Sequence, residues 1–209
     1  MKPIIGISLR ITNAEKYVEK RDSISHDWPI LLEKLGFSPL LIPNTISNIP
    51  EFLDEMKISG LILSGGDNIG DDVIRDKTEN DILNYAISHN VPLIGVCRGM
   101  QIINSFFGGK TQLLDNANHV NKSHMVNINN HFPFQNNPIQ VNSFHHNIID
   151  KLNLGKNLSS FAISKDDNTI EGLIHNELSI IGVMWHPERN PDTNSHILLK
   201  KFFLKQLLK

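Results

Sequence analysis

The only cysteine of the chain stands between an apolar run and a run with helical spacing. Residues 91–96 are mostly apolar and predict a buried strand, and residues 100–107 repeat apolar side chains on one helical face. The segment between them reads Gly-Val-Cys-Arg-Gly over residues 95–99, which is the glycine-flanked pattern of a nucleophile elbow. Glycine permits sharp turns, so the pattern predicts that Cys97 projects at the end of a sheet.

A helix that begins directly after Cys97 would affect its chemistry. The dipole at a helix N-terminus favours an anion, so we expect the pKa of the thiol to fall below its ordinary value of about 8.5. The alternative interpretation is an unreactive core cysteine, because most lone cysteines are buried.

A second segment, residues 180–188, supplies the partners that a cysteine nucleophile needs. It is an apolar strand that finishes in His186-Pro187-Glu188. On an extended chain, residues i and i+2 point to the same side, so His186 and Glu188 are predicted to lie side by side. Nucleophilic catalysis by cysteine requires a base and a group that orients the base. The chain therefore predicts a Cys97–His186–Glu188 triad, and the alternative is a solvated turn at the end of a strand.

Strands and helices alternate along most of the chain. Predicted strands cover residues 4–9, 39–42, 60–63 and 91–96. One helix is predicted from an Asp27 cap to a Gly36 stop, and another from an Asp76/Glu79 capping box to Asn90. This order predicts an α/β fold, a doubly wound and mostly parallel sheet with helices on both faces, as a single domain over residues 1–209. Such sheets place their sites at the carboxyl ends of strands, where Cys97, Gly66 and His186 all fall.

The middle of the chain, residues 110–150, has a different character. It is rich in asparagine and histidine and has no helical period, which predicts short antiparallel strands or long loops. Its histidines do not follow a known metal-ligand spacing, so we expect no metal and no other cofactor. An apolar stripe near the C-terminus predicts a helix that packs on the core through Ile197, Leu198, Phe202, Phe203 and Leu207.

Composition narrows the class of partner and the compartment. Forty per cent apolar residues and a net charge of −2 are ordinary values, which disfavour a binder of nucleic acid polymers. A single cysteine cannot form an internal disulfide, and no apolar run approaches the roughly 20 residues of a membrane span. We therefore expect a cytoplasmic protein that does not bind membranes and acts on a small molecule. A homodimer is compatible with these features.

The two motifs together resemble a known family. Gly-Val-Cys97-Arg-Gly-Met-Gln and Trp-His186-Pro-Glu look like the active-site motifs of class I glutamine amidotransferase-type hydrolases, whose fold is flavodoxin-like. The arginine after the cysteine resembles the gamma-glutamyl-gamma-aminobutyrate hydrolase branch. The chain departs from that branch at Met184, where glutamine is usual, at residues 68–72, and in a shorter N-terminal third. Supporting matches are residues 61–67, Arg75-Asp76 with Glu79, residues 141–146, and Ile170-Glu171.

The resemblance implies a reaction and roles for further residues. Cys97 would attack a gamma-glutamyl amide to form a glutamyl thioester, and the backbone N–H groups of Gly66 and Arg98 would stabilise the oxyanion. Gln101 and the segment Ser143-Phe144-His145 would hold the glutamyl head group.

Plainer interpretations stand beside these roles. In the plainer interpretation, Gln101 is an exposed helix residue that binds no substrate. His145 and His146 then only pack against neighbouring residues. The Arg98 side chain binds either a substrate anion or a carboxylate of the protein, Glu79 or Glu171.

Three functions stay open at this point. The first is a stand-alone hydrolase that releases glutamate from an N-linked metabolite. Its leaving group would be gamma-aminobutyrate, another amine, or a nucleotide-linked amidate, because a gamma-glutamyl-CDP-amidate hydrolase of capsule biosynthesis resembles a short form of this branch. The second is a glutaminase subunit that supplies ammonia to a synthase partner. The third is a catalytically idle binding module, which the intact Cys97, His186 and Glu188 disfavour.

Overall fold

The computed structural model describes residues 2–113, 120–128, 138–189 and 193–204. Its centre is a nine-stranded sheet in the order β4-β1-β5-β6-β13-β12-β11-β8-β9. Neighbouring strands from β4 to β13 run parallel, and those from β13 to β9 run antiparallel. The strands are β1 (Ile4–Ser8), β4 (Ser38–Ile42), β5 (Gly60–Leu63), β6 (Leu93–Val96), β13 (Ile180–Val183), β12 (Ile170–His175), β11 (Leu158–Ser164), β8 (Val120–Ile128) and β9 (Ile139–Phe144).

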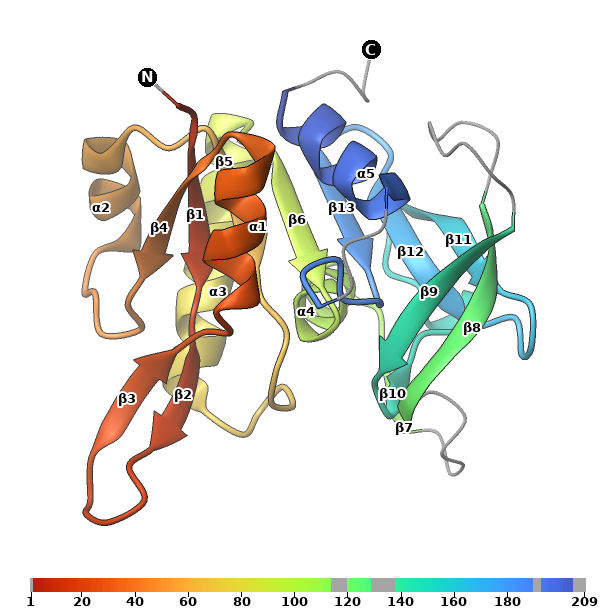
Figure 1. The fold of residues 1–209 in the computed structure, drawn as a ribbon, viewed down its shortest axis with the longest axis horizontal. Helices are drawn as coiled ribbons and strands as arrows, with labels where there is room; N and C mark the ends of the chain where they lie inside the picture. Colours follow the sequence, from red (N-terminus) through yellow and green to blue (C-terminus); the bar gives the residue numbers. More distant parts are fainter. Residues whose placement is uncertain (1, 114–119, 129–137, 190–192, 205–209) are drawn as a thin grey trace.

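Helices cover both faces of this sheet, which confirms the predicted α/β architecture (Figure 1). On one face lie α1 (Asp27–Leu35) and α5 (Thr193–Phe203), and on the other α2 (Ile49–Met56), α3 (Val73–His89) and α4 (Arg98–Phe106). Each face has its own buried apolar cluster, one containing Trp28 and Phe202 and the other Leu53 and Ile103.

The predicted C-terminal helix is present as α5. Leu198, Phe202 and Phe203 are buried there, as expected for a helix that packs on the core. Ile197 is half-buried, and Leu207 lies outside the described residues.

The predicted helix ends are only partly right. Gly36 ends α1 with φ 91° and Asn90 ends α3 with φ 50°, both left-handed as expected. Asp27, however, is the first residue of α1 rather than its cap, which is His26. The Asp76/Glu79 capping box is also wrong, because α3 begins one turn earlier. Asp72 caps it by accepting a hydrogen bond from the N–H of Ile74 at 3.0 Å.

Short antiparallel pieces complete the fold. A hairpin of β2 (Arg10–Asn13) and β3 (Lys20–Ser23) projects beyond the carboxyl end of β1 (Figure 1). β7 (Gln112–Leu113) pairs with β10 (Asn147–Ile148), and a 3₁₀ helix covers Lys151–Asn153. Together with β8 and β9, these pieces confirm the antiparallel interpretation of the middle region. The asparagine and histidine residues of this region that lie outside the described residues include His119, Asn129, Asn130, His131, Asn136 and Asn137.

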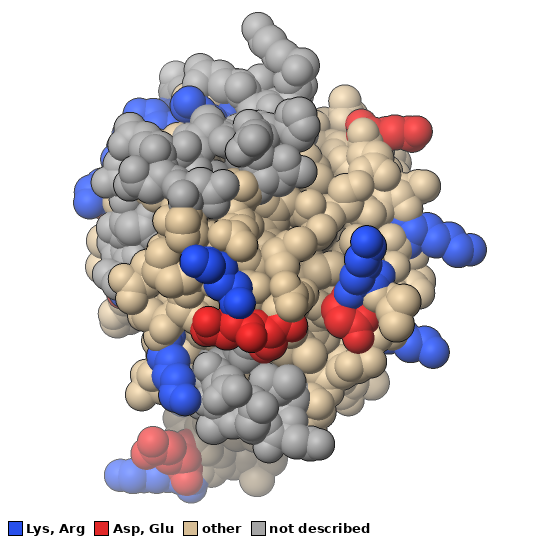
Figure 2. Space-filling view, turned by 90° about the vertical axis from the view of Figure 1, so that its right-hand side faces the viewer, with Lys and Arg blue, Asp and Glu red and all other residues tan. Residues whose placement is uncertain are grey.

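Figure 2 faces the end of the sheet formed by β8 and β9. Charged side chains are scattered over this face, and several basic side chains lie next to acidic ones. Within the described ranges, each helix falls short of the length and apolarity that crossing a membrane would require.

Candidate active site

The elbow is present at the carboxyl end of β6. Cys97 joins β6 to α4 with φ 51° and ψ −104°, an uncommon conformation for a residue with a side chain. Its N–H donates a hydrogen bond to the carbonyl of Val183, the last residue of the neighbouring strand β13, at 2.8 Å. The strained backbone thus falls on Cys97 itself, and the bond to Val183 helps to hold it.

The flanking glycines serve close packing rather than a positive φ. A Cβ atom on Gly95 would lie 2.4 Å from the carbonyl oxygen of Gly99, and one on Gly99 would lie 2.2 Å from that of Leu63. Both distances are far below contact, so only glycine lets α4 approach β5 and β6 this closely. The elbow is therefore confirmed, and its two glycines allow the close turn because a side chain at either position would collide with the backbone.

Burial dominates the chemistry of the thiol. Cys97 is 7% exposed, and burial raises the pKa of its thiol to about 12. A hydrogen bond from the backbone N–H of Arg98 acts in the opposite direction and does not compensate. The expected fall in this pKa is therefore wrong, because desolvation of the thiolate outweighs the helix N-terminus. Arg189, Glu188 and Glu171 are all close enough to Cys97 to influence its charge.

His186 and Glu188 are hydrogen-bonded to each other. His186 Nδ1 lies 2.7 Å from Glu188 Oε1, and both residues are buried. A carboxylate can only accept, so the proton of this bond belongs to Nδ1, which leaves Nε2 as the nitrogen able to take a proton. The predicted contact is confirmed, but the extended strand is not. β13 ends at Val183, and the pair lies on a turn in which the N–H of Arg189 donates to the carbonyl of His186 at 3.3 Å.

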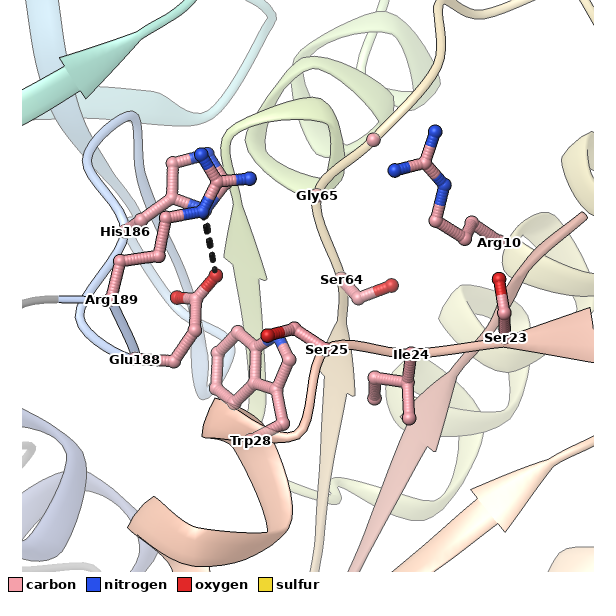
Figure 3. Close-up of a pocket in the computed structure, with 11 residues that line it drawn as sticks. Arg10, Ser23, Ile24, Ser25, Trp28, Ser64, Gly65, His186, Glu188 and Arg189 are labelled. Atoms are coloured by element: carbon pink, nitrogen blue, oxygen red, sulfur yellow. Dashed lines mark hydrogen bonds and ion pairs between the residues drawn. The ribbon is translucent and has the colours of Figure 1, made fainter. Parts of the chain in front are cut away.

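The imidazole of His186 has close neighbours on two other elements. A Cβ atom on Gly65 would lie 2.7 Å from Cε1 of His186, so the loop after β5 is in close contact with the ring (Figure 3). The Phe144 ring on β9 meets it edge-on, with centroids 5.7 Å apart.

Asn142 on β9 binds the backbone of His186 at two points. Its Oδ1 accepts from the N–H of His186 and its Nδ2 donates to the carbonyl of the same residue, both at 2.8 Å. In the sequence, Asn142 lies within a segment that supports the family resemblance, but its spacing indicates no role for it.

A buried arginine fixes the direction of the loop after β5, here called the glycine-pair loop because it contains Gly65 and Gly66. Arg75 Nη2 donates to the carbonyls of Ser64 at 3.0 Å and of Gly65 at 2.9 Å. In a trans peptide the N–H points opposite to the C=O, so the N–H of Gly66 faces away from Arg75. Gly66 has φ 127°, which only glycine adopts readily. The carbonyl at residue 65 and the N–H at residue 66 therefore have a defined orientation.

The Arg98 side chain is structural. It is 1% exposed and forms ion pairs with Asp76 and Glu79. Glu79 also accepts from Arg75 Nε at 3.0 Å and from Ser8 Oγ at 2.9 Å. Of the two interpretations of this side chain, the ion pair with Glu79 is confirmed and binding of a substrate anion is wrong. Only the backbone N–H of Arg98 is available for an oxyanion.

The residues expected to hold a glutamyl group are mostly buried. Gln101 is 3% exposed, and its Oε1 accepts from Asn147 Nδ2 at 3.4 Å, so it is not an exposed helix residue. Ser143 is buried, Phe144 is 36% exposed, and His146 is exposed.

His145, which follows β9, belongs to a buried polar cluster with His124 and Glu171. Its Nε2 lies 3.6 Å from Glu171 Oε1, and His124 Nε2 lies 3.4 Å from Glu171 Oε2. Burial alone would raise the pKa of Glu171, but hydrogen bonds from His124 and His145 lower it to about 2. The same carboxylate raises the pKa of His124 against its burial. In the part of the chain that the structure describes, no group of three or more His, Cys, Asp or Glu residues could hold a metal ion.

A pocket opens beside His186 and Glu188. Arg10 and Arg189 stand on opposite sides of it, and Trp28 lies beneath Glu188 (Figure 3). The remaining lining comes from the end of β3, from the β3–α1 connection and from the loop after β5: Ser23, Ile24, Ser25, Ser64, Gly65 and Gly66.

Comparison with known proteins gives consistent matches. The family model described as glutamine amidotransferase class-I matches residues 17–206. The chain is 32% identical over 208 residues to a gamma-glutamyl-CDP-amidate hydrolase of Campylobacter jejuni, covering 95% of this chain and 96% of that protein. It is 27% identical over 174 residues to a glutamine-hydrolysing GMP synthase subunit of Methanococcus maripaludis, covering 83% and 87%. A solved glutamine amidotransferase structure from Thermotoga maritima has the same fold, with a TM-score of 0.67 at 16% identity, over 99% of this chain and 85% of that one.

Proposed function

The chain belongs to the class I glutamine amidotransferase family, and from this premise we propose that it is a stand-alone hydrolase of gamma-glutamyl amides. One observation carries the proposal. The hydrogen-bonded pair His186–Glu188 follows β13, and Cys97 occupies a strained elbow after β6, the parallel neighbour of β13. A base, its orienting carboxylate and a cysteine thus come from the same edge of the sheet, which supports nucleophilic catalysis by these three groups.

In the proposed first step, the thiol of Cys97 loses its proton to His186 Nε2 while its sulfur forms a bond to the carbonyl carbon of the substrate. Proton transfer and attack are coupled, because burial disfavours a free thiolate. Glu188 holds the ring through Nδ1 and stabilises the imidazolium. The proton then passes to the leaving nitrogen, the C–N bond breaks, and a glutamyl thioester remains. Attack by water, with His186 as base, releases glutamate and restores the thiol.

The oxyanion of each tetrahedral intermediate needs donors placed in advance. We assign this role to the N–H of Arg98, which already points toward the sulfur of Cys97, and to the N–H of Gly66. Removing one such donor typically lowers kcat by about 10²- to 10³-fold. The two ion-paired arginines, Arg75 and Arg98, keep both backbone segments rigid.

Gln101, Ser143, Phe144 and His145 are proposed to hold the glutamyl head group. The amide of Gln101 contacts the sulfur of Met184 on one side and Asn147 on the other, so a polar group lies one helical turn from Cys97. Met184 at this position, where the related branch has glutamine, replaces a hydrogen-bonding side chain with an apolar one.

The leaving group is either an amine or a nucleotide-linked amidate. The similarity to the Campylobacter jejuni protein, which extends over nearly all of both chains, supports the second class. A glutaminase that supplies ammonia to a synthase is the second candidate, supported by the similarity to the GMP synthase subunit of Methanococcus maripaludis.

The test is a panel of gamma-glutamyl amides, including glutamine, in which glutamate release gives kcat/KM for each. The proposal expects at least one N-substituted amide to be hydrolysed much faster than glutamine, and Cys97→Ala to abolish release while the protein stays folded. If glutamine is the best substrate and a synthase partner accelerates its hydrolysis, the glutaminase candidate is correct.

A further inference from the structure

A second pocket, of about 270 Å³, shares Arg189 with the first. Its lining is Asn121, Lys122 and Ser123 from β8, Asn142 and Phe144 from β9, and Arg189. Two of these side chains are cationic, and none of the described residues that line the pocket is acidic. The pocket therefore suits an anionic group with polar surroundings.

Three residues that line the second pocket also contact the proposed catalytic histidine or lie in the same turn. Asn142 makes the paired hydrogen bonds to the backbone of His186, and the ring of Phe144 stacks edge-on against the imidazole. Arg189 follows His186 in the same turn and lines both pockets. A group bound here would consequently lie next to the scissile bond and not at a distant surface.

Among the described residues, the guanidinium of Arg189 has one aromatic contact and one long ion pair. It lies 4.5 Å from the centroid of the Phe144 ring, a cation–π arrangement that restricts its plane. Its Nε is 3.9 Å from Glu188 Oε1, a distance too long for a hydrogen bond, and its side chain is 41% exposed. Arginine presents a planar set of donors that matches the oxygens of a phosphoryl group.

We propose that this pocket binds the leaving group of the substrate and that this group carries a phosphoryl moiety. The inference rests on the proposed hydrolase function and deepens it. Arg189 and Lys122 bind the phosphoryl oxygens, while the amide of Asn121 and the hydroxyl of Ser123 offer further hydrogen bonds. A volume of about 270 Å³ fits a single small anion better than a polyanion.

The experiment compares three substrates that differ only in the leaving amine: the gamma-glutamyl amides of 2-aminoethyl phosphate, gamma-aminobutyrate and ethylamine. We expect kcat/KM to be highest for the phosphoryl substrate. Arg189→Gln and Lys122→Gln should each lower the ratio of kcat/KM between the phosphoryl and ethylamine substrates by about tenfold or more, as expected for loss of a charge-assisted contact. Lys156→Gln, an exposed lysine outside both pockets, is the matched control and should leave the ratio unchanged.

The outcomes separate this inference from the function on which it rests. Hydrolysis of the ethylamide with no preference for phosphate, or equal preference for the carboxylate substrate, overturns the phosphoryl site and leaves the hydrolase standing. If no amide is hydrolysed, the hydrolase proposal fails, and the site is then judged by binding. Calorimetry of Cys97→Ala with 2-aminoethyl phosphate should show binding that Arg189→Gln weakens about tenfold, and absence of binding overturns the site.

Discussion

Asn142 holds the backbone of His186 through two hydrogen bonds of 2.8 Å, one accepted and one donated. β13 ends at Val183, and beyond it the Asn142 side chain binds the backbone of His186 in the way that a neighbouring strand would. The imidazole is oriented separately by Glu188, so the backbone and the ring of His186 have independent supports.

Replacing Asn142 should therefore disturb catalysis through His186. We expect Asn142→Ala to lower kcat by roughly 10- to 100-fold, because a displacement of about 1 Å in a catalytic group has an effect of this size. Asn142→Asp, which can accept from the N–H but cannot donate to the carbonyl, should fall between Asn142→Ala and the unaltered protein. Steady-state kinetics with the best gamma-glutamyl substrate checks this, with the exposed strand neighbour Gln140→Ala as the control. Equal activity in Asn142→Ala and Gln140→Ala would contradict the positioning role.

The raised pKa of Cys97 makes a prediction about labelling. Folding raises the pKa of the thiol, so little thiolate is present at neutral pH. The thiolate fraction increases as the pH rises toward about 12. Iodoacetamide should label the folded protein slowly at pH 7 and faster with each step upward, while a denatured sample, with a pKa near 8.5, labels faster at the same pH. Mass spectrometry of the labelled fraction against pH measures this. Rapid labelling of folded protein at pH 6 would show that the helix N-terminus outweighs burial after all.

The same shift affects stability in a defined range. A group whose pKa is raised by folding stabilises the folded state below its unfolded pKa, and this contribution is lost as the pH rises toward the folded value. The free energy of unfolding should thus decrease above about pH 8.5 in the unaltered protein, and less so in Cys97→Ala.

The parts of this molecule that follow from local pattern were predictable. β5 and β6 are short apolar runs between turn residues, and Gly36 and Asn90 end helices because they accept a left-handed backbone. The Cys97 elbow and the neighbouring His186 and Glu188 were likewise identifiable from their spacing.

What could not be predicted depends on contacts between distant segments. Asp76 and Glu79 have the spacing of a capping box, but both carboxylates bind the buried side chain of Arg98, which is 22 and 19 residues further along the chain. The sign of the Cys97 pKa shift depends on how deeply the fold buries the thiol. The roles of Arg75 and Asn142 arise from hydrogen bonds to backbone atoms, which leave no pattern in a single sequence.

Arg75 and Arg98 offer a matched comparison, since both are buried and both bind Glu79. Only Arg75 also donates to the carbonyl of Gly65 and so orients the neighbouring N–H of Gly66. We expect Arg75→Lys and Arg98→Lys to lower Tm to a similar extent, because each weakens the same buried ion-pair group. Arg75→Lys should additionally lower kcat, with a smaller change in KM, as loss of an oriented oxyanion donor requires. Similar kcat values in the two variants would show that the glycine-pair loop does not depend on Arg75.

Gly65 allows the contact between the loop after β5 and the ring of His186 to be tested directly. A Cβ atom there would lie 2.7 Å from His186 Cε1, so in Gly65→Ala the imidazole must move or the loop must retreat. Either movement changes the geometry of the base relative to Cys97, and we expect kcat to fall about 100-fold. Gly66→Ala serves as the comparison. Gly66 has a φ of 127°, which is unfavourable for any residue with a side chain, and a Cβ atom there would lie 2.9 Å from Arg75 Nη1. Gly66→Ala should therefore lower Tm more than Gly65→Ala does, whereas Gly65→Ala should lose activity with a smaller change in Tm. Measuring kcat and Tm for both variants decides the matter, since an active Gly65→Ala protein would mean that His186 does not need its observed position for turnover.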